Sequence, residues 1–178
     1  LETFRTLNNN EIRKLNDIAK KYNIKYQNKH KLDLVDEILS NVDVIPNSIV
    51  LAQAAIESGW GKSRFAKEYN ALFGEYTYDD SEGVIPLERE NGDTHLIKAF
   101  SSYSNSVESY FDNINSHYAY EDFRDIRNIM RKRNNFSNVN LLVNKLSTYA
   151  EDENYIKTIR QVIKTNNFSI FDQKTITY

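Results

Sequence analysis

The strongest constraint on the fold of this chain is an apolar helical stretch that ends in a carboxylate and two glycines. The stretch covers residues 46–61 and reads PNSIVLAQAAIESGWG. Pro46 suits the first turn of a helix. Gly59 and Gly61 interrupt the helical pattern and predict where the helix stops. We therefore expect an apolar helix over residues 47–58.

Glu57 stands near the end of this apolar helix and is difficult to explain by packing. No basic residue precedes it within two helical turns, and the first cations after it, Lys62 and Arg64, follow the glycines. Burying an unpaired charge is costly. Apolar neighbours and the negative end of a helix both raise the pKa of a carboxyl group. We expect Glu57 to keep its proton and to face a cleft, as a general acid must.

Gln53 lies four residues before Glu57, so the two side chains share one face of the helix. Ile56 and Trp60 fall along the same side. In a core, each polar group on this face would need a hydrogen-bond partner, which makes full burial of the face unfavourable. The face is therefore expected to border the cleft. Ser58 has no evident histidine partner, and we expect it to hydrogen-bond near the helix end and orient the carboxyl group.

Length and composition predict one globular domain, alone or with a short arm, because 178 residues can bury a real core. The 23 basic and 25 acidic residues nearly cancel, so nothing points to nucleic acid or to anionic lipid. The absence of cysteine excludes disulfides, thiolate metal ligands and a cysteine nucleophile. No run of about 18 apolar residues predicts a membrane span. Because the chain begins at Leu1, we expect a processed or truncated piece.

Aromatic side chains are abundant, with 12 Tyr and 9 Phe against 1 Trp. Tyr combines an apolar face with a hydroxyl group, which suits a groove that stacks on sugars. An aromatic core with hydroxyl groups at its edge explains the same composition. We expect that second arrangement for most of the tyrosines.

Helical periodicity dominates the chain, with one interruption. Apolar residues recur at helical spacing in residues 11–22, 32–44, 47–58, 63–69, 104–114, 122–133, 139–150 and 155–165. Residues 75–99 instead form short runs, and Asn91-Gly92 predicts a β-hairpin turn there. Residues 168–178 show no period and are expected to form a docked or mobile tail. The predicted fold class is mainly α (α+β), a helical domain with a small antiparallel β-hairpin lobe.

A second carboxylate opposite Glu57 would come from this lobe. Two carboxylates that flank a bond are the usual equipment for glycoside hydrolysis. Rigid strands position groups better than loops do, so the hairpin favours Glu88 or Glu90. For each single candidate, a solvated surface carboxylate is the competing interpretation. The candidates are Glu75, Asp79, Asp80, Glu82, Glu88, Glu90 and Asp93.

Other chemistries have less support in the sequence. His30, His95 and His117 lie far apart and form no paired metal-binding motif, so no metal site is predicted. No glycine-rich phosphate loop and no Gly-x-Ser-x-Gly elbow is present. No cofactor is therefore expected.

Several motifs in order resemble the bacterial glucosaminidase superfamily, glycoside hydrolase family 73, which includes flagellar peptidoglycan hydrolases and autolysins. The resemblance is best to its Bax-like branch and runs from about Pro46 to Ile163. The motifs that carry it are residues 46–61, Ser63-Arg64-Phe65-Ala66, Asn70-Ala71-Leu72-Phe73-Gly74, Thr94-His95, Ala99-Phe100, Ser106-Val107-Glu108-Ser109-Tyr110, Asn113-Ile114-Asn115-Ser116-His117-Tyr118-Ala119-Tyr120, Leu146-Ser147-Thr148-Tyr149-Ala150 and Tyr155.

This resemblance implies a lysozyme-like fold and a set of site residues. Residues 46–167 would be the catalytic domain, residues 1–45 a helical arm packed on it, and residues 168–178 a tail. Glu57 corresponds to the catalytic acid, Glu88 to a second acid in the hairpin, and Tyr149 to a tyrosine used in catalysis or sugar binding. The substrate-binding residues it implies are Gln53, Ser58, Trp60, Asn70, Phe73 and Tyr155.

The implied activity is cleavage of the β-1,4 bond after N-acetylglucosamine in peptidoglycan or a related glycan. If no second acid approaches Glu57, the substrate's own N-acetyl group could act as the nucleophile, positioned by Tyr149. Such a substrate implies the periplasm or the cell surface, and we expect a monomer. Three alternatives stay open: a lytic transglycosylase, a catalytically silent glycan-binding module, and a structural protein in which a buried hydrogen bond satisfies Glu57.

Overall fold

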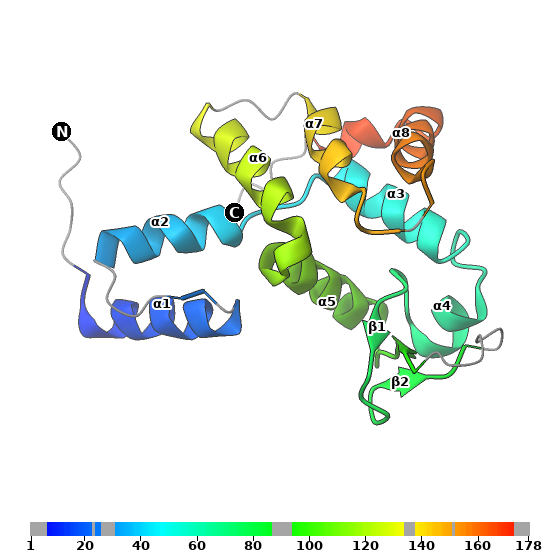
Figure 1. Cartoon of the computed structure of the whole chain (residues 1–178), viewed down its shortest axis with the longest axis horizontal. Helices are drawn as coiled ribbons and strands as arrows, with labels where there is room; N and C mark the ends of the chain where they lie inside the picture. The colour runs from blue at the N-terminus through cyan, green and yellow to red at the C-terminus, as the bar shows by residue number, and fades with distance from the viewer. Residues whose placement is uncertain are drawn as a thin grey trace.

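Helices form most of the computed structural model, which describes residues 7–22, 24–25, 31–86, 94–133, 138–150 and 152–172 (Figure 1). The α-helices are α1 (Asn9–Lys21), α2 (Lys31–Asn41), α3 (Asn47–Glu57), α4 (Arg64–Tyr69), α5 (Tyr103–Ser116), α6 (Glu121–Lys132), α7 (Val139–Val143) and α8 (Tyr155–Thr165). Short 3-10 helices are η1 (Tyr118–Tyr120), η2 (Asn144–Leu146) and η3 (Phe168–Phe171). The strands are β1 (Tyr76–Thr77), β2 (Gly83–Val84) and β3 (Leu96–Lys98).

Helix α3 lies at the centre of the main core, as its apolar sequence predicts. It begins directly after Pro46 and buries Ile49 and Ala52 completely. Helix α8 and η3 pack along it, and the aromatic ring of Phe73 stacks on that of Tyr110 from α5 at 4.2 Å. Fully burying an aliphatic side chain contributes about 1.5–3 kcal/mol, so this helix organises much of the fold.

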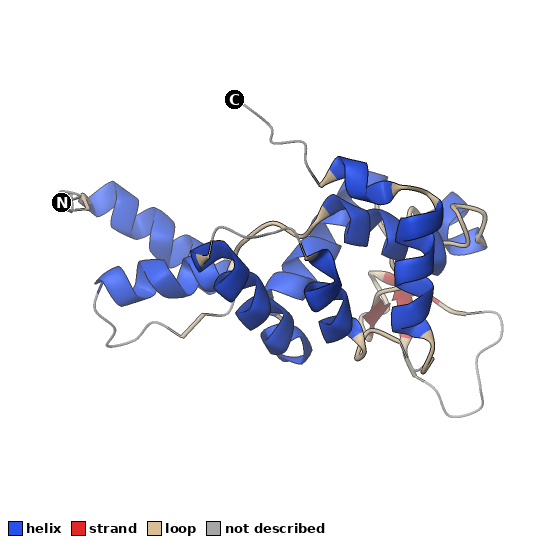
Figure 2. Cartoon of the chain, turned by 90° about the horizontal axis from the view of Figure 1, so that it is seen from above, coloured by secondary structure: helices blue, strands red, loops and turns tan. Residues whose placement is uncertain are grey.

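The first two helices form a separate layer with a core of their own. Ala19, Ile24, Leu34 and Ile38 are buried together between α1 and α2. Figures 1 and 2 show this pair projecting at one end of the molecule. It contacts the rest of the chain through α2 against α6, and through an ion pair of 3.1 Å between Lys21 and Asp112 of α5.

A three-stranded antiparallel sheet forms the β lobe, in the order β1-β3-β2. Ile97 of β3 stands opposite Tyr76 on one side and Val84 on the other. Strands β2 and β3 are therefore antiparallel neighbours, as expected for a hairpin. The predicted turn at Asn91-Gly92 lies outside the described residues.

Three predicted element boundaries differ from the structure. Helix α2 ends at Asn41 instead of residue 44, because Val42, Val44 and Ile45 are β-branched and Ile45 precedes a proline. The helix expected over 139–150 stops at residue 143 and continues only as η2, which leaves Tyr149 in a loop. The start of the expected tail is η3, docked on α3.

Two hydrogen bonds hold η3 and the residue after it to the start of α3. The Ser48 amide donates to Asp172 Oδ1 at 2.8 Å, and the Asn47 side-chain amide donates to the Phe171 carbonyl at 2.9 Å. The segment therefore caps the first turn of α3, where backbone N–H groups lack helical partners.

Candidate active site

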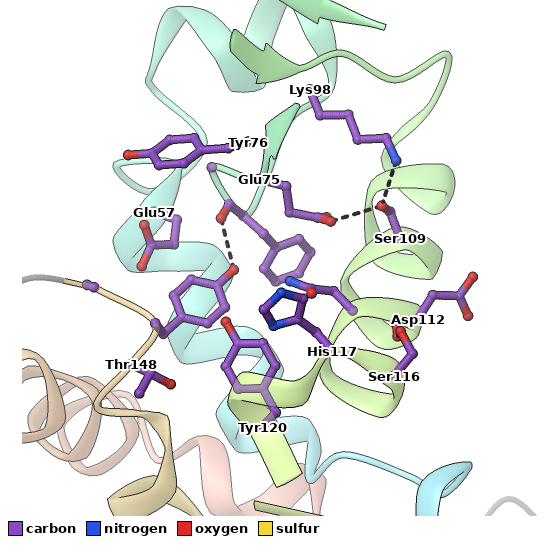
Figure 3. Close-up of a pocket in the computed structure, with 15 residues that line it drawn as sticks. Glu57, Glu75, Tyr76, Lys98, Ser109, Asp112, Ser116, His117, Tyr120 and Thr148 are labelled. Atoms are coloured by element: carbon purple, nitrogen blue, oxygen red, sulfur yellow. Dashed lines mark hydrogen bonds between the residues drawn. The ribbon is translucent and has the colours of Figure 1, made fainter. Parts of the chain in front are cut away.

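A pocket of about 1080 Å³ lies between the end of α3, the β lobe, α5, η1 and the loop after η2 (Figure 3). Segments far apart in the sequence therefore meet around one space. The residues that line it are Glu57, Phe73, Gly74, Glu75, Tyr76, Lys98, Ser109, Asp112, Asn113, Ser116, His117, Tyr120, Thr148, Tyr149 and Ala150.

Glu57 is the last residue of α3 and opens onto this pocket. Its Oε1 accepts a hydrogen bond of 2.7 Å from the Tyr155 hydroxyl group. Its Oε2 lies beside Gly74, where an added Cβ would be 3.6 Å away. Burial raises the pKa of Glu57 above its ordinary value, and the hydrogen bond from Tyr155 partly opposes that rise. The protonated carboxyl group predicted from the sequence therefore has a physical basis here.

Two further hydrogen bonds connect Tyr155 to Gln53 and Gln53 to Tyr110. Together with the bond from Tyr155 they form a chain of donors that ends on Glu57. The Tyr110 hydroxyl donates to Gln53 Oε1 at 2.6 Å, and Gln53 Nε2 donates to the Tyr155 hydroxyl oxygen at 2.9 Å. Tyr155 then donates to Glu57. Gln53 and Glu57, one helical turn apart, are thus bridged by a residue of α8.

The donor chain leaves one carboxyl oxygen for the proton. Burial raises the pKa of both Tyr110 and Tyr155, so each phenol keeps its proton and donates it, Tyr110 to Gln53 and Tyr155 to Glu57. Because Oε1 accepts from Tyr155, the acidic hydrogen of neutral Glu57 belongs on Oε2. That oxygen is the one beside Gly74 at the pocket.

Removing the last donor of this chain should raise the pKa of Glu57. A hydrogen bond to a charged group contributes about 1.5–3 kcal/mol, equivalent to roughly 1–2 pKa units. In Tyr155→Phe the carboxylate loses that bond, so we expect the basic limb of any glycosidase activity to move upward by about one pH unit. The pH dependence of kcat/KM measures this shift. Tyr103→Phe, an exposed tyrosine of α5, is the matched control, and an unchanged limb in Tyr155→Phe would contradict the assignment.

Tyr149 lies at the pocket wall, in the loop after η2. Its hydroxyl group donates to the Phe73 carbonyl at 2.9 Å. Its ring is parallel to that of Tyr155, with ring centroids 5.8 Å apart and planes at 4°. Tyr149 therefore joins the segment before Gly74 to the residue that holds Glu57.

The six residues predicted to bind substrate are not equivalent in the structure. Phe73 lines the pocket. Gln53 is fully buried and Tyr155 nearly so, and their direct contact with a glycan stays a prediction. Both act on Glu57 through the donor chain. Ser58 is also buried, and its hydroxyl oxygen accepts from the Gly61 amide at 2.8 Å, so it closes the turn after α3 and does not reach the carboxyl group.

Trp60 and Asn70 also lie outside the pocket lining. Trp60 lies beyond the end of α3 with a φ of 60°, so it does not continue the helical face that the sequence predicts. Its ring is 55% exposed and lies 6.5 Å from that of Phe168, away from the pocket lining. Asn70 ends α4 in the left-handed region, and its amide donates to the Phe100 carbonyl at 2.9 Å.

The pocket also contains residues that the sequence left unassigned. Tyr76 and Lys98 come from the lobe, and His117 and Tyr120 from the end of α5 and from η1. His117 and Tyr120 belong to a motif that carries the family resemblance, which was the available signal. Glu75 was one of seven candidate acids and lines the pocket. Glu88, the second acid that the resemblance implies, lies outside the described residues, as do Glu90 and Asp93.

The described part of the chain offers neither a metal cluster nor a membrane-spanning helix. Those residues include no group of three or more His, Cys, Asp or Glu side chains that could hold a metal ion. Within the same residues, the helices are too short or too polar to cross a membrane.

Sequence comparison identifies the family. The family model Glucosaminidase, described as mannosyl-glycoprotein endo-beta-N-acetylglucosaminidase, matches residues 32–168. The chain belongs to the glucosaminidase family. This confirms the enzyme class predicted from the sequence, a glycoside hydrolase, at the level of the family.

Two curated relatives support the predicted branch. The chain is 35% identical to Protein bax of Escherichia coli (strain K12) over 137 residues, which are 77% of this chain and 48% of that protein. It is 35% identical to Peptidoglycan hydrolase FlgJ of the same strain over 92 residues, covering 46% of this chain and 29% of FlgJ. The chain thus spans about half the length of the first relative and less of the second.

Two solved structures share the fold. The catalytic domain of the autolysin Auto from Listeria monocytogenes aligns with a TM-score of 0.53 at 18% identity, covering 96% of this chain and 92% of that one. An N-acetylmuramoyl-L-alanine amidase structure from Staphylococcus aureus aligns with a TM-score of 0.55 at 21% identity, covering 99% and 50%. These similarities confirm a mainly α fold with a small β lobe.

Proposed function

We propose that the chain is a peptidoglycan hydrolase that cleaves the β-1,4 bond after N-acetylglucosamine, with Glu57 as the general acid. The observation that carries this proposal is the Glu57 carboxyl group, whose pKa is raised by burial, with Oε1 held by Tyr155 and Oε2 at the pocket. Family membership supports the glycosidase chemistry. The printed name of FlgJ, a peptidoglycan hydrolase, supports the substrate.

In the proposed reaction, Glu57 Oε2 gives its proton to the glycosidic oxygen as the bond from that oxygen to C1 breaks. Positive charge develops on the sugar ring, as in other glycosidases. A water molecule adds to C1, where it leaves a hydroxyl group, and its other proton passes to a base. The products are a new reducing end on N-acetylglucosamine and a free 4-hydroxyl group on the leaving sugar. Glu57, now ionised, regains its proton from solvent.

The pocket has the chemistry of a sugar site. Tyr76 is 65% exposed at its edge and is braced by His95, with ring centroids 4.3 Å apart. The rings of His117 and Tyr118 lie 4.4 Å apart with their planes at 33°, on the side formed by η1. Exposed aromatic rings backed by a second ring give rigid apolar surfaces for pyranose faces. No cofactor enters this scheme, and the substrate implies the periplasm or the cell surface.

Loss of the Tyr76 ring is expected to weaken substrate binding more than it slows the chemical step. An aromatic contact of this size contributes about 1 kcal/mol, so Tyr76→Ala should raise KM for soluble glycan fragments roughly fivefold with kcat little changed. Tyr78→Ala is the matched control, because Tyr78 is 77% exposed on the same lobe but does not line the pocket. Equal KM values for Tyr76→Ala and Tyr78→Ala would remove Tyr76 from the binding site.

Product analysis after incubation with purified murein tests the proposed function itself. We expect fragments with N-acetylglucosamine at the reducing end, identified by mass spectrometry before and after borohydride reduction. Anhydro-sugar ends would instead identify a lytic transglycosylase. Binding to murein without any product would identify a silent glycan-binding module.

A further inference from the structure

A second carboxyl group, Glu75, lies in the same pocket as Glu57 (Figure 3). The two come from different walls, since Glu57 ends α3 and Glu75 directly precedes β1. The Glu57 side chain reaches Gly74, the residue before Glu75, where an added Cβ would lie 3.6 Å from Glu57 Oε2. Glu75 is the next residue after Gly74, and consecutive Cα atoms are about 3.8 Å apart. The Glu75 backbone is therefore close to the Glu57 carboxyl group.

The other described acids of the lobe have different surroundings. Asp79, Asp80 and Glu82 are exposed and do not line the pocket. Asp79 accepts hydrogen bonds from Ser81 in a turn, and Glu82 pairs with Lys98 at 3.8 Å. Among the lobe carboxylates that the structure describes, Glu75 is therefore the one placed to act on a bound substrate.

The Glu75 carboxyl group is only half satisfied. Its Oε2 accepts a hydrogen bond of 2.9 Å from the Ser109 hydroxyl group, which in turn accepts from Lys98 Nζ at 3.4 Å. Its Oε1 is buried and has no hydrogen-bond partner among the described residues. A buried polar atom without a hydrogen-bond partner is costly, and native structures tolerate one mainly where something else binds. Water or a sugar hydroxyl entering the pocket is such a partner.

Charged neighbours distinguish the two carboxyl groups. Burial raises the pKa of Glu75, whereas the Ser109 hydrogen bond and the Lys98 charge lower it and Asp112 raises it slightly. Lys98 comes from β3 and Asp112 from α5, where Lys21 pairs with it. The pKa of Glu75 stays above its ordinary value because burial is the largest effect, but the Lys98 cation opposes that rise, whereas at Glu57 only the neutral Tyr155 donor does so. A difference of this kind in the surroundings of two carboxyl groups suits an acid and base pair.

We propose that Glu75 is the second carboxyl group of the reaction, the base that takes a proton from the attacking water. This inference rests on the proposed function. As the water oxygen bonds to C1, its proton passes to the Glu75 carboxylate, while the bond from C1 to the glycosidic oxygen breaks and Glu57 protonates that oxygen. The two carboxyl groups exchange states, and solvent restores them. The attack is on the face opposite the leaving group, so the β bond gives an α-configured product.

The decisive variants are Glu75→Gln and Glu75→Ala, assayed with soluble peptidoglycan glycan fragments. Glu75→Gln keeps the shape and should lower kcat by about 10²-fold or more, the usual size of a general base effect. The acid limb of its pH profile should disappear, which a structural defect would not cause. In Glu75→Ala, added azide should restore turnover by attacking C1, and NMR should show the α-linked glycosyl azide.

Two controls make the result interpretable. Asp80→Asn removes an exposed lobe carboxylate and should change kcat less than twofold. Glu88→Gln tests the acid that the resemblance implies. Near-normal activity of Glu75→Gln, azide rescue in Glu88→Ala instead of Glu75→Ala, or a β-configured wild-type product would overturn the proposal. Absence of any cleavage by the wild-type protein would overturn the proposed function instead, so the two failures are distinct.

Discussion

Glu57→Gln should lower peptidoglycan cleavage by about 10²–10⁴-fold, the range for loss of a general acid, and leave the protein folded. The amide oxygen can still accept the hydrogen bond from Tyr155, but the amide has no acidic proton to give to the leaving sugar. Release of reducing ends from purified murein measures the loss. Thermal unfolding of the variant should occur at the same temperature as the wild-type protein or higher, because a partly buried ionisable group has been removed.

Glu68→Gln provides the matched control for this change. Glu68 is exposed on α4 and forms an (i, i+4) ion pair with Arg64 at 3.9 Å, so its removal should alter neither activity nor stability measurably. Wild-type release of reducing ends by Glu57→Gln would refute the general acid and, with it, the proposed function. Loss of activity together with loss of the folded state would instead support a structural role for the carboxyl group.

Glu57 could be predicted from the sequence because the features that point to it lie close together in the chain. An apolar helix, a carboxylate without a nearby cation and two glycines are all within 16 consecutive residues, and helix geometry then places Gln53 one turn away. The partners that complete the site are not local. Tyr155 lies 98 residues beyond Glu57, and Tyr110 lies 57 beyond Gln53. Periodicity predicts that these tyrosines are in helices, but not which helix faces α3.

The same limit applies to the predicted binding residues. A motif shows that a residue type recurs at a position, and for that reason it predicts Ser58, Trp60 and Asn70 as substrate contacts. In the structure they shape the backbone around the end of α3 and α4. Positive φ values at Trp60 and Asn70 are conformations that sequence patterns do not reveal.

Arg127 is the largest fully buried side chain of the described residues, and no sequence pattern distinguishes it from the other cations of α6. Its guanidinium donates to the backbone carbonyls of Asn41, Asp43 and Val44 at 2.7–3.3 Å. It also donates to Asn115 Oδ1 at 2.7 Å. Burial lowers the pKa of Arg127 to about 10, which leaves it charged at neutral pH. One side chain thus supplies donors to the carbonyls left free where α2 ends early.

Arg127→Leu should therefore destabilise the fold by about 3–5 kcal/mol, the cost of breaking a buried charged network from one side. The carbonyls and the Asn115 amide oxygen would lose their donors, although relief of the buried charge offsets part of this. Arg127→Lys should recover only a fraction, since a compact ammonium cannot span the acceptors that the planar guanidinium reaches. The free energy of unfolding from urea titrations, followed by far-UV circular dichroism, gives the values.

Arg131→Leu is the control for this series, one turn further along α6. Its side chain is 52% exposed and pairs with Asp43, so its loss should cost less than about 1 kcal/mol. A similar small value for Arg127→Leu would mean that water replaces the guanidinium at the end of α2. A large value for Arg127→Leu and a small one for Arg131→Leu would show that the junction between the first two helices and the body depends on a single buried cation. The Glu57 pocket would then depend on it only through global stability, because Arg127 does not line that pocket.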